Sequence, residues 1–304
     1  MKNVVKLVAL FFVMLTVVPL TALVFSVNQD KFVLYDQFTQ KEMYVSKRDY
    51  LIGAVASEMP ASFHIEAMKA QAAAIYTNAI RLSSQKKTVA NINSQNNSGY
   101  INQKKLKEMW GKNFDNYYEK VSAAVDEVFG SVISFDGKPI LAAYHSMSSG
   151  KTQKAEDVWG QDVPYLVSVD SEGDTFCTDF ETQKEVETSV AREILKEEYP
   201  QTHLPEIDSL LITDRTESDC GAVVSVIIGD KTVSGQKMRE MFDLRSASFT
   251  YEIVDSKIKF TVKGYGHGVG LSQYGADFMA RQGSKWQEII SHYYKGTEIL
   301  YINK

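Results

Sequence analysis

The sequence predicts an α+β fold in an exported domain, preceded by one N-terminal transmembrane helix. Residues 7–27 carry no charge and, at about 21 residues, are long enough to cross a bilayer as a helix. Apolar residues then recur at helical spacing over residues 51–82 and 117–129. From residue 131 onward, short β-rich runs alternate with turn residues, which is typical of antiparallel hairpins. Helices and hairpins in separate stretches favour the α+β class.

Residues 1–29 are expected to form a membrane anchor. Lys2 and Lys6 precede the apolar stretch, so the N-terminus should stay in the cytoplasm and the chain after Asp30 should be exported. The apolar core is longer than that of a cleavable signal peptide, and no Ala-x-Ala-like site follows it, which favours an uncleaved anchor. We therefore expect a single-pass protein of the cell membrane with an extracytoplasmic domain over residues 30–304.

Composition limits the function classes that the exported part can serve. With 44% hydrophobic residues the chain can bury a proper core. A net charge of -5 without a long basic run argues against nucleic acid as a partner. Cys177 and Cys220 could form a disulfide, which would stabilise the fold by about 4 kcal/mol on the entropy model, or remain separate buried thiols.

The first elements of the exported part are predicted to be two helices separated by a proline. Leu51, Val55 and Met59 share one helical face, and Pro60 ends that helix. The second helix covers residues 65–82, and its many alanines should let another element pack closely. Residues 91–104 then read as a polar surface loop before the helix at 117–129.

The later elements are predicted to be hairpins with short helices between them. A hairpin over residues 131–144, turning at Asp136-Gly137, should deliver His145 at a strand end. Further hairpin turns are indicated at Gly229-Asp230 and Asp255-Ser256, with a helix over residues 236–242 between them. Residues 170–220, with a charged helix at 188–199, could be an insertion or a small subdomain.

Glu58 is the first candidate for chemistry, because it is a carboxylic acid between an apolar helix and a proline. Poor solvation there would penalise the charged form and raise the pKa from about 4.3 toward roughly 6, which suits a general acid. Glu66 lies in the first turn of the next helix, where a carboxylate favours the helix dipole, so we expect it to be structural.

Residues 264–276 read Gly-Tyr-Gly-His-Gly-Val-Gly-Leu-Ser-Gln-Tyr-Gly-Ala, and this glycine density allows close approach of backbone. A dinucleotide-binding loop is excluded by the spacing, because Val269 and Leu271 stand where that motif needs glycine. The segment also follows a hairpin instead of opening a βαβ unit.

Residues 144–152 and 156–166 combine an imidazole, small hydroxyls and aromatic rings, as sugar-binding clefts do. An ordinary polar loop remains an alternative interpretation. A serine nucleophile served by His145 or His267 is a minor option, since no Gly-x-Ser-x-Gly elbow occurs. A zinc site of His145, Cys177, Cys220 and His267 is improbable, because these residues lack the close pairs of zinc motifs.

Four motifs in fixed order resemble the stage II sporulation protein D family and the related amidase-enhancer proteins. The first is Ala54-Val55-Ala56-Ser57-Glu58-Met59-Pro60, which continues to the run from Glu66 to Ala72. The second comprises His145-Ser146-x-Ser148-x-Gly150, Asp157-Val158-Trp159 and Pro164-Tyr165-Leu166. The third and fourth are residues 266–276 and His292-Tyr293-Tyr294-x-Gly296-Thr297. One departure is Tyr76, which stands where family members usually carry an arginine.

The resemblance implies a peptidoglycan lytic transglycosylase that acts at the septum during engulfment in endospore-forming bacteria. Its catalytic acid would be Glu58, and it would need no metal or organic cofactor. Expected partners are glycan strands, an amidase that strips stem peptides and a membrane protein that recruits both. The groups expected to hold the glycan are His145, Ser146, Ser148, Ser272, Gln273 and Tyr274. The rival function is a binding module that stimulates an amidase without cutting glycan, and a third is a purely structural engulfment protein.

Overall fold

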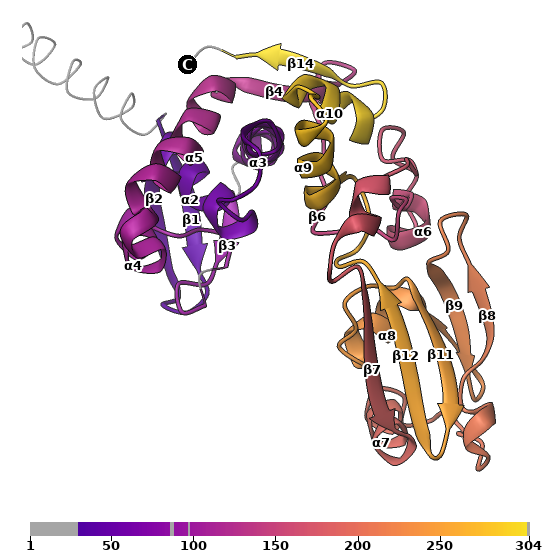
Figure 1. Cartoon of the computed structure of the whole chain (residues 1–304). Coiled ribbons are helices and arrows are strands. Elements are labelled where there is room, and N and C mark those ends of the chain that lie inside the picture. Colours follow the sequence, from indigo (N-terminus) through magenta and orange to yellow (C-terminus); the bar gives the residue numbers. More distant parts are fainter. Residues whose placement is uncertain (1–29, 86–87, 97, 303–304) are drawn as a thin grey trace, which may run out of the picture.

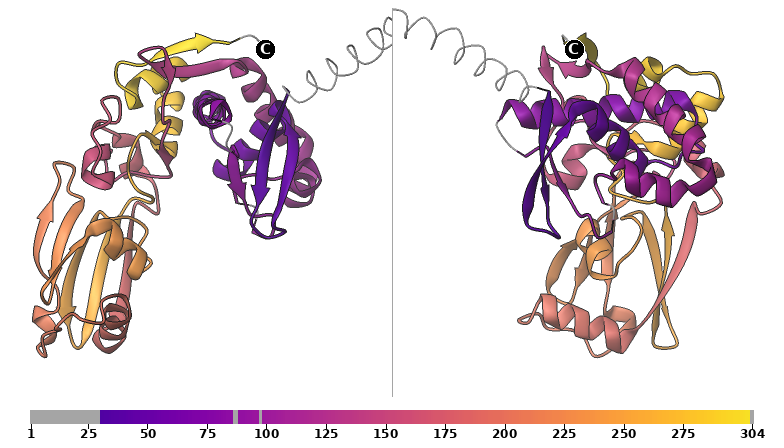
Figure 2. Two further views of the ribbon diagram at one scale, coloured as in Figure 1. Left: turned by 180° about the vertical axis from the view of Figure 1, so that it is seen from behind. Right: turned by 90° about the vertical axis from the view of Figure 1, so that its left-hand side faces the viewer.

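The computed structural model describes residues 30–85, 88–96 and 98–302, which form an α+β protein of two lobes (Figure 1). Each lobe has its own hydrophobic core, one built from residues within 32–169 and 269–294 and the other from residues within 191–262. Figure 2 shows the same two lobes from behind and from the side. The predicted anchor over residues 1–29 lies outside the described residues, and within those residues no helix has the length and hydropathy to span a membrane.

Helix α3 forms the centre of the first lobe, where it packs against α2, α5, α9 and α10 (Figure 1). Ala70, Ala72, Ala73 and Ala74 are fully buried, which confirms the predicted close packing around this helix. The helices of this lobe are α2 (Lys47–Glu58), α3 (Ile65–Ser84), α4 (Gln103–Trp110), α5 (Phe114–Val128), α6 (Ala155–Trp159), α9 (Gln273–Arg281) and α10 (Trp286–Tyr293), with 3-10 turns η1 (Gly111–Asn113) and η2 (Glu172–Phe176).

Helix α2 begins before its apolar stripe because Ser46 caps it: the Asp49 N–H donates to Ser46 Oγ at 3.1 Å. It ends at Glu58, since Met59 is extended and Pro60 cannot continue a helix. The predicted helix end is therefore confirmed.

Small sheets flank these helices. Strand β1 pairs antiparallel with β2 and parallel with β3, a hairpin that the sequence analysis did not identify. The strands of this lobe are β1 (Lys31–Asp36), β2 (Lys41–Ser46), β3 (Ala90–Ile92), β4 (Ser131–Phe135), β5 (Lys138–Pro139), β6 (Tyr144–His145), β13 (Leu271–Ser272) and β14 (Glu298–Tyr301).

The hairpin predicted over residues 131–144 is correct only in its first part. Strands β4 and β5 do turn at Asp136-Gly137, where both residues have positive φ. The predicted second arm up to Tyr144 is wrong, because β6 pairs in parallel with β13. The N–H groups between β5 and β6 donate to side chains of other elements instead: Leu141 N–H donates to Tyr165 OH and Ala142 N–H to Asn78 Oδ1.

The second lobe contains two three-stranded antiparallel sheets, β11-β12-β7 and β10-β9-β8. The hairpin turns predicted at Gly229-Asp230 and Asp255-Ser256 are confirmed, and two helices lie close to their predicted positions. The elements are β7 (Glu181–Glu187), α7 (Thr188–Glu198), η3 (Asp208–Leu210), β8 (Thr213–Glu217), β9 (Val223–Ile228), β10 (Lys231–Ser234), α8 (Gly235–Met241), β11 (Phe249–Val254) and β12 (Lys257–Lys263).

The glycine-rich segment returns the chain from β12 to the first lobe. Tyr265 bridges to Met147 and Val269 to Gln153 before β13 begins. Gly270 has φ +75°, and a Cβ there would collide with the carbonyl of Ala143. The predicted close approach of backbone is therefore confirmed.

Candidate active site

Glu58 is the last residue of α2, and the loop that follows it is fixed from two sides. Lys120 Nζ on α5 donates to the carbonyls of Ala61 (3.0 Å) and Phe63 (2.5 Å). On the other side, the N–H of His64 donates to Asp277 Oδ1 on α9. The end of α2 is thus held between elements that are far apart in sequence.

The side chain of Glu58 lines a cavity of about 400 Å³, within the size range of small-molecule sites. The walls come from α2, α3, the segment around β3 and the chain leading into β6. The lining residues are Tyr50, Ala54, Glu58, Ile75, Asn78, Arg81, Leu82, Val89, Ala90, Asn91, Ser98, Gly99, Leu141 and Tyr144.

Burial raises the pKa of Glu58 above its ordinary value, as the sequence analysis predicted. Its carboxyl makes no hydrogen bond or ion pair within the described residues, so no partner offsets the desolvation. Burial, together with the charge of Glu58, also raises the pKa of Tyr50 and of Tyr144. Both phenols therefore stay protonated near neutral pH and can donate hydrogen bonds beside the acid.

Glu66 has the opposite environment. Its Oε1 accepts from Lys69 Nζ at 2.7 Å and its Oε2 from the Trp286 N–H at 2.9 Å. Burial alone would raise the pKa of Glu66, but these hydrogen bonds and the charge of Lys69 outweigh burial and hold it below the ordinary value. Glu66 is thus a charged structural residue that links α3 to the start of α10, in agreement with its predicted role.

Replacing Glu66 by alanine is expected to lower the free energy of unfolding by about 3 kcal/mol, because Lys69 would lose a buried partner and keep only Glu127. If the protein cleaves glycan as the sequence analysis predicts, the rate per folded molecule should stay close to that of the parent, since Glu66 is absent from the lining of the Glu58 cavity. Denaturant unfolding and product release measure the two effects. A rate loss with unchanged stability would instead identify Glu66 as the acid.

His145 lies in the interior beside the cavity. It is 4% exposed, and its Nδ1 lies 3.2 Å from the Val269 carbonyl. Its ring centroid is 5.7 Å from that of His267, which in turn is 5.4 Å from Trp159. Burial lowers the pKa of His145 to about 3 and that of His267 to about 4, so both rings are neutral near pH 7.

Ser148 and Ser272 are buried partners of Asp174, a residue that the sequence analysis did not single out. Asp174 is fully buried and accepts from Ser148 Oγ (2.6 Å), Ser148 N–H (2.8 Å) and Ser272 Oγ (2.7 Å). The two hydroxyls therefore join η2, β13 and the loop after β6. Both hydroxyls thus bond to a buried carboxylate in this structure, and their role as glycan contacts stays a prediction.

The other three predicted contacts also lie around this junction. The Ser146 carbonyl accepts from the Tyr274 N–H, Gln273 is buried, and the ring of Tyr274 packs edge-on against Phe63 at 4.9 Å. None of the six predicted glycan-binding residues lines the Glu58 cavity formed by the described part of the chain. The neighbour that reaches it is Tyr144.

Sequence reasoning missed several walls of the cavity. Asn78 and Arg81 face it from α3, and a signal was present, because they are polar positions three residues apart on a helix rich in alanine. Asn91 and Ser98 come from the segment that was predicted to be a surface loop. Asn91 and Ser98 reach the cavity because β3 pairs with β1, and the residue pattern around position 91 does not reveal this pairing.

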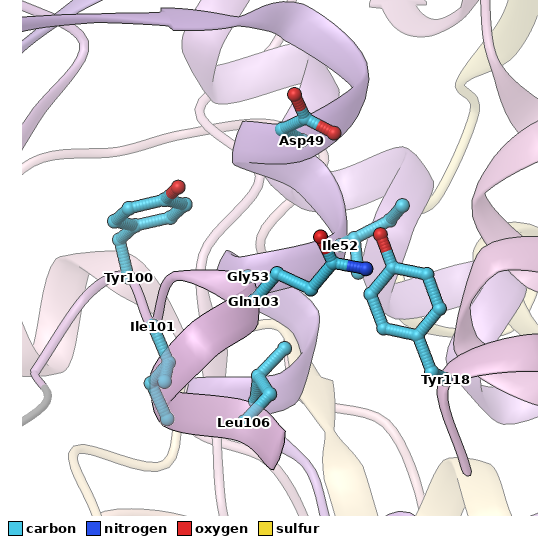
Figure 3. Close-up of a pocket in the computed structure, with 8 residues that line it drawn as sticks. All are labelled: Asp49, Ile52, Gly53, Tyr100, Ile101, Gln103, Leu106 and Tyr118. Atoms are coloured by element: carbon cyan, nitrogen blue, oxygen red, sulfur yellow. The ribbon is translucent and has the colours of Figure 1, made fainter. Parts of the chain in front are cut away.

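A second, smaller cavity of about 130 Å³ lies on another face of α2 (Figure 3). It is lined by Asp49, Ile52, Gly53, Tyr100, Ile101, Gln103, Leu106 and Tyr118. Its volume is below the usual range for ligand sites. Ser46 Oγ also donates to the carboxylate of Asp49 at 2.7 Å, so this acid already serves the helix cap. The Glu58 cavity is therefore the better candidate.

Comparison with known proteins places the chain in a family. The family model described as "Stage II sporulation protein" matches residues 35–135, which include Glu58. Stage II sporulation protein D of Bacillus subtilis (strain 168) is 33% identical over 274 residues, covering 88% of this chain and 78% of the relative. That of Bacillus amyloliquefaciens is 36% identical over 266 residues, covering 83% and 73%. An amidase enhancer of Bacillus subtilis (strain 168) is 27% identical over 300 residues, covering 82% and 40%. The chain belongs to the stage II sporulation protein D family and is related to the amidase enhancer.

Proposed function

We propose that the protein is a lytic transglycosylase that cuts the glycan strands of peptidoglycan. The observation that carries this proposal is Glu58, a carboxyl without a partner among the described residues, whose pKa is raised by burial in a cavity of about 400 Å³. A protonated acid at neutral pH is what departure of a sugar leaving group requires. The resemblance to sporulation proteins of this family supports peptidoglycan as the substrate.

In the proposed reaction Glu58 acts twice. Its proton goes to the oxygen that links muramic acid to glucosamine, and the bond from that oxygen to the anomeric carbon breaks. The muramoyl 6-hydroxyl then bonds to the anomeric carbon, and its proton returns to Glu58. Atoms balance without water, and the products are a glucosamine end and a 1,6-anhydromuramoyl end.

The number of carboxyls in the cavity supports this reaction over hydrolysis. Glycosidases usually use two carboxylates on either side of the bond. Among the described residues that line the cavity, Glu58 is the only carboxylic acid. In the proposed reaction an intramolecular hydroxyl of the substrate serves as the nucleophile in place of a second carboxylate. Tyr50 and Tyr144 offer hydrogen bonds to sugar hydroxyls, and Tyr144 also offers an aromatic face.

The test is product analysis of purified glycan strands after incubation with the protein. Mass spectrometry should find new 1,6-anhydromuramoyl ends, which hydrolysis cannot give. New reducing ends in place of anhydro ends would identify a hydrolase. Strands without any new end would rule the proposed reaction out.

A second candidate function is supported by the likeness to the amidase enhancer. In this alternative the protein binds cell wall and stimulates a partner amidase without cutting glycan. Intact strands together with faster release of stem peptides by an added amidase would identify this function.

The relatives' names indicate a role in sporulation. We propose that the protein acts at the sporulation septum during engulfment, held to the membrane by residues 7–27, together with a stem-peptide amidase and a membrane partner. Membrane fractionation of the full chain and of a variant without residues 1–29 tests the anchor. Equal recovery of both in the soluble fraction would contradict it.

A further inference from the structure

Arg81 contributes a positive charge to the Glu58 cavity from the C-terminal half of α3. It follows Asn78 by three residues, so both polar side chains reach the cavity from neighbouring turns of one helix. Among the described residues that line the cavity, Arg81 is the only cation and Glu58 the only acid.

Among the described residues, the guanidinium of Arg81 has no hydrogen-bond or ion-pair partner. Its Nε is buried without a hydrogen bond, and Arg81 makes no ion pair with any other residue of the described part. A buried donor left unpaired destabilises the fold, and the penalty is larger for a charged group. A guanidinium offers several donors in a plane, which suits a carboxylate held by two parallel hydrogen bonds. The missing partner is therefore best explained as a group of the ligand.

Arg81 does not neutralise the charge of Glu58. The two side chains form no ion pair, and burial is the one cause that moves the pKa of Glu58. The residues on which the charge of Glu58 acts are Tyr50 and Tyr144. The cavity thus has an acidic group and a cationic group that serve different parts of a ligand.

We propose that Arg81 is a substrate-binding residue that pairs with a carboxylate of the glycan strand while Glu58 faces the glycosidic oxygen. This inference rests on the proposed function in that it takes the ligand to be peptidoglycan. The carboxylate can come from two sources, the lactyl group of a peptide-free muramic acid or a stem peptide. Neutral sugars do not provide such a partner, so Arg81 gives the cavity a preference for muramoyl residues.

The experiment measures binding, so that it does not depend on turnover. The full chain in detergent carries Glu58→Gln to keep the strands intact, and its dissociation constant is measured by calorimetry. The three ligands are peptide-free glycan oligosaccharides, the same oligosaccharides with lactyl carboxylates converted to methylamides, and peptide-bearing oligosaccharides. Arg81→Gln and Arg81→Lys are compared in this background, with Lys104→Gln, an exposed residue of α4, as the control for lost charge.

Arg81→Gln should weaken binding of the ligand that carries the recognised carboxylate, either the peptide-free or the peptide-bearing oligosaccharide, by about 10- to 100-fold and leave the methylamide ligand unaffected. Arg81→Lys should recover part of the loss, and Lys104→Gln should bind like its parent. Preferential binding of the peptide-free or of the peptide-bearing strand by the parent identifies the source of the carboxylate.

The proposal is overturned if the parent binds the methylamide ligand as tightly as both carboxylate-bearing ligands, or if Arg81→Gln changes the affinity for all three ligands equally. The proposed reaction fails separately: a protein with Glu58 intact that gives no anhydro ends, while binding still depends on Arg81, contradicts the transglycosylase and leaves this inference standing.

Discussion

Replacing Glu58 by glutamine is expected to slow the release of anhydromuramoyl ends by about 10³-fold while the protein remains folded. Glutamine keeps the size of the side chain but has no proton to donate and cannot take one back, and acid-base catalysis typically contributes about 10²- to 10⁴-fold. Both halves of the proposed reaction depend on this group. The anhydro ends released per hour, counted by mass spectrometry, measure the effect.

Two controls separate this result from a general effect of lost charge. Glu119→Gln removes an exposed carboxylate from α5 and should leave the rate unchanged. Glu66→Gln removes the other acid of the first motif, which lies outside the cavity. A Glu58→Gln protein that still releases anhydro ends at the parent's rate would disprove the assignment.

The same substitution should stabilise the protein at neutral pH. Burial raises the pKa of Glu58 in the folded state above its reference value of 4.5, so the folded state holds its proton more strongly than the unfolded state. The stability contributed by protonated Glu58 is fully present below pH 4.5 and is lost as the pH rises through the folded-state pKa. The glutamine variant should therefore melt at a higher temperature than its parent near pH 7, and the difference should close toward pH 4.5. A lower melting temperature at pH 7 would contradict the burial argument.

The sequence predicted the raised pKa of Glu58 and the helices around it because those features are local. Pro60 fixes the end of α2, and the alanines of α3 require close neighbours wherever they lie in the fold. Glu58 consequently falls at a helix end beside a packed core, and its desolvation follows from that position. The turns at Asp136-Gly137 and Asp255-Ser256 were predictable for the same reason, since residue type decides which backbone conformations are accessible.

The walls of the cavity could not be predicted in this way. Tyr144 lies beside Glu58 because β6 does not pair with β4, as predicted for a hairpin, but with β13, a strand more than a hundred residues later. Hydroxyls of a serine-rich motif look alike whether they face solvent, a sugar or a buried carboxylate. Asp174 lies in the charged run of η2, which by pattern resembles an exposed turn, yet the residue is completely buried. Partners distant in sequence decide each of these cases.

Replacing Asp174 by alanine is accordingly expected to lower the free energy of unfolding by about 3–5 kcal/mol. The change leaves the Ser148 N–H and the hydroxyls of Ser148 and Ser272 without their common acceptor. Ser148 Oγ also accepts from the Gly150 N–H, and Ser272 Oγ accepts from the Gly275 N–H in the first turn of α9. Loss of Asp174 should therefore destabilise both of these segments. For a chain of this size the melting temperature should fall by about 10 °C, measured by calorimetry.

Matched serine variants decide between the supporting role and the predicted glycan contact. Ser148→Ala and Ser272→Ala each remove a hydroxyl from Asp174 and should each lower stability by about 1–2 kcal/mol, with KM for glycan unchanged. Ser284→Ala, at a partly buried serine of the loop before α10, should change neither quantity. A raised KM with unchanged melting temperature would instead mean that Ser148 or Ser272 contacts the glycan.

Loss of Asp174 should also disturb the cavity wall beside Glu58, because Tyr144 lies in β6 and the loop bonded to Asp174 follows directly after it. The rate of glycan cleavage by Asp174→Ala should therefore fall even at temperatures where the variant is fully folded.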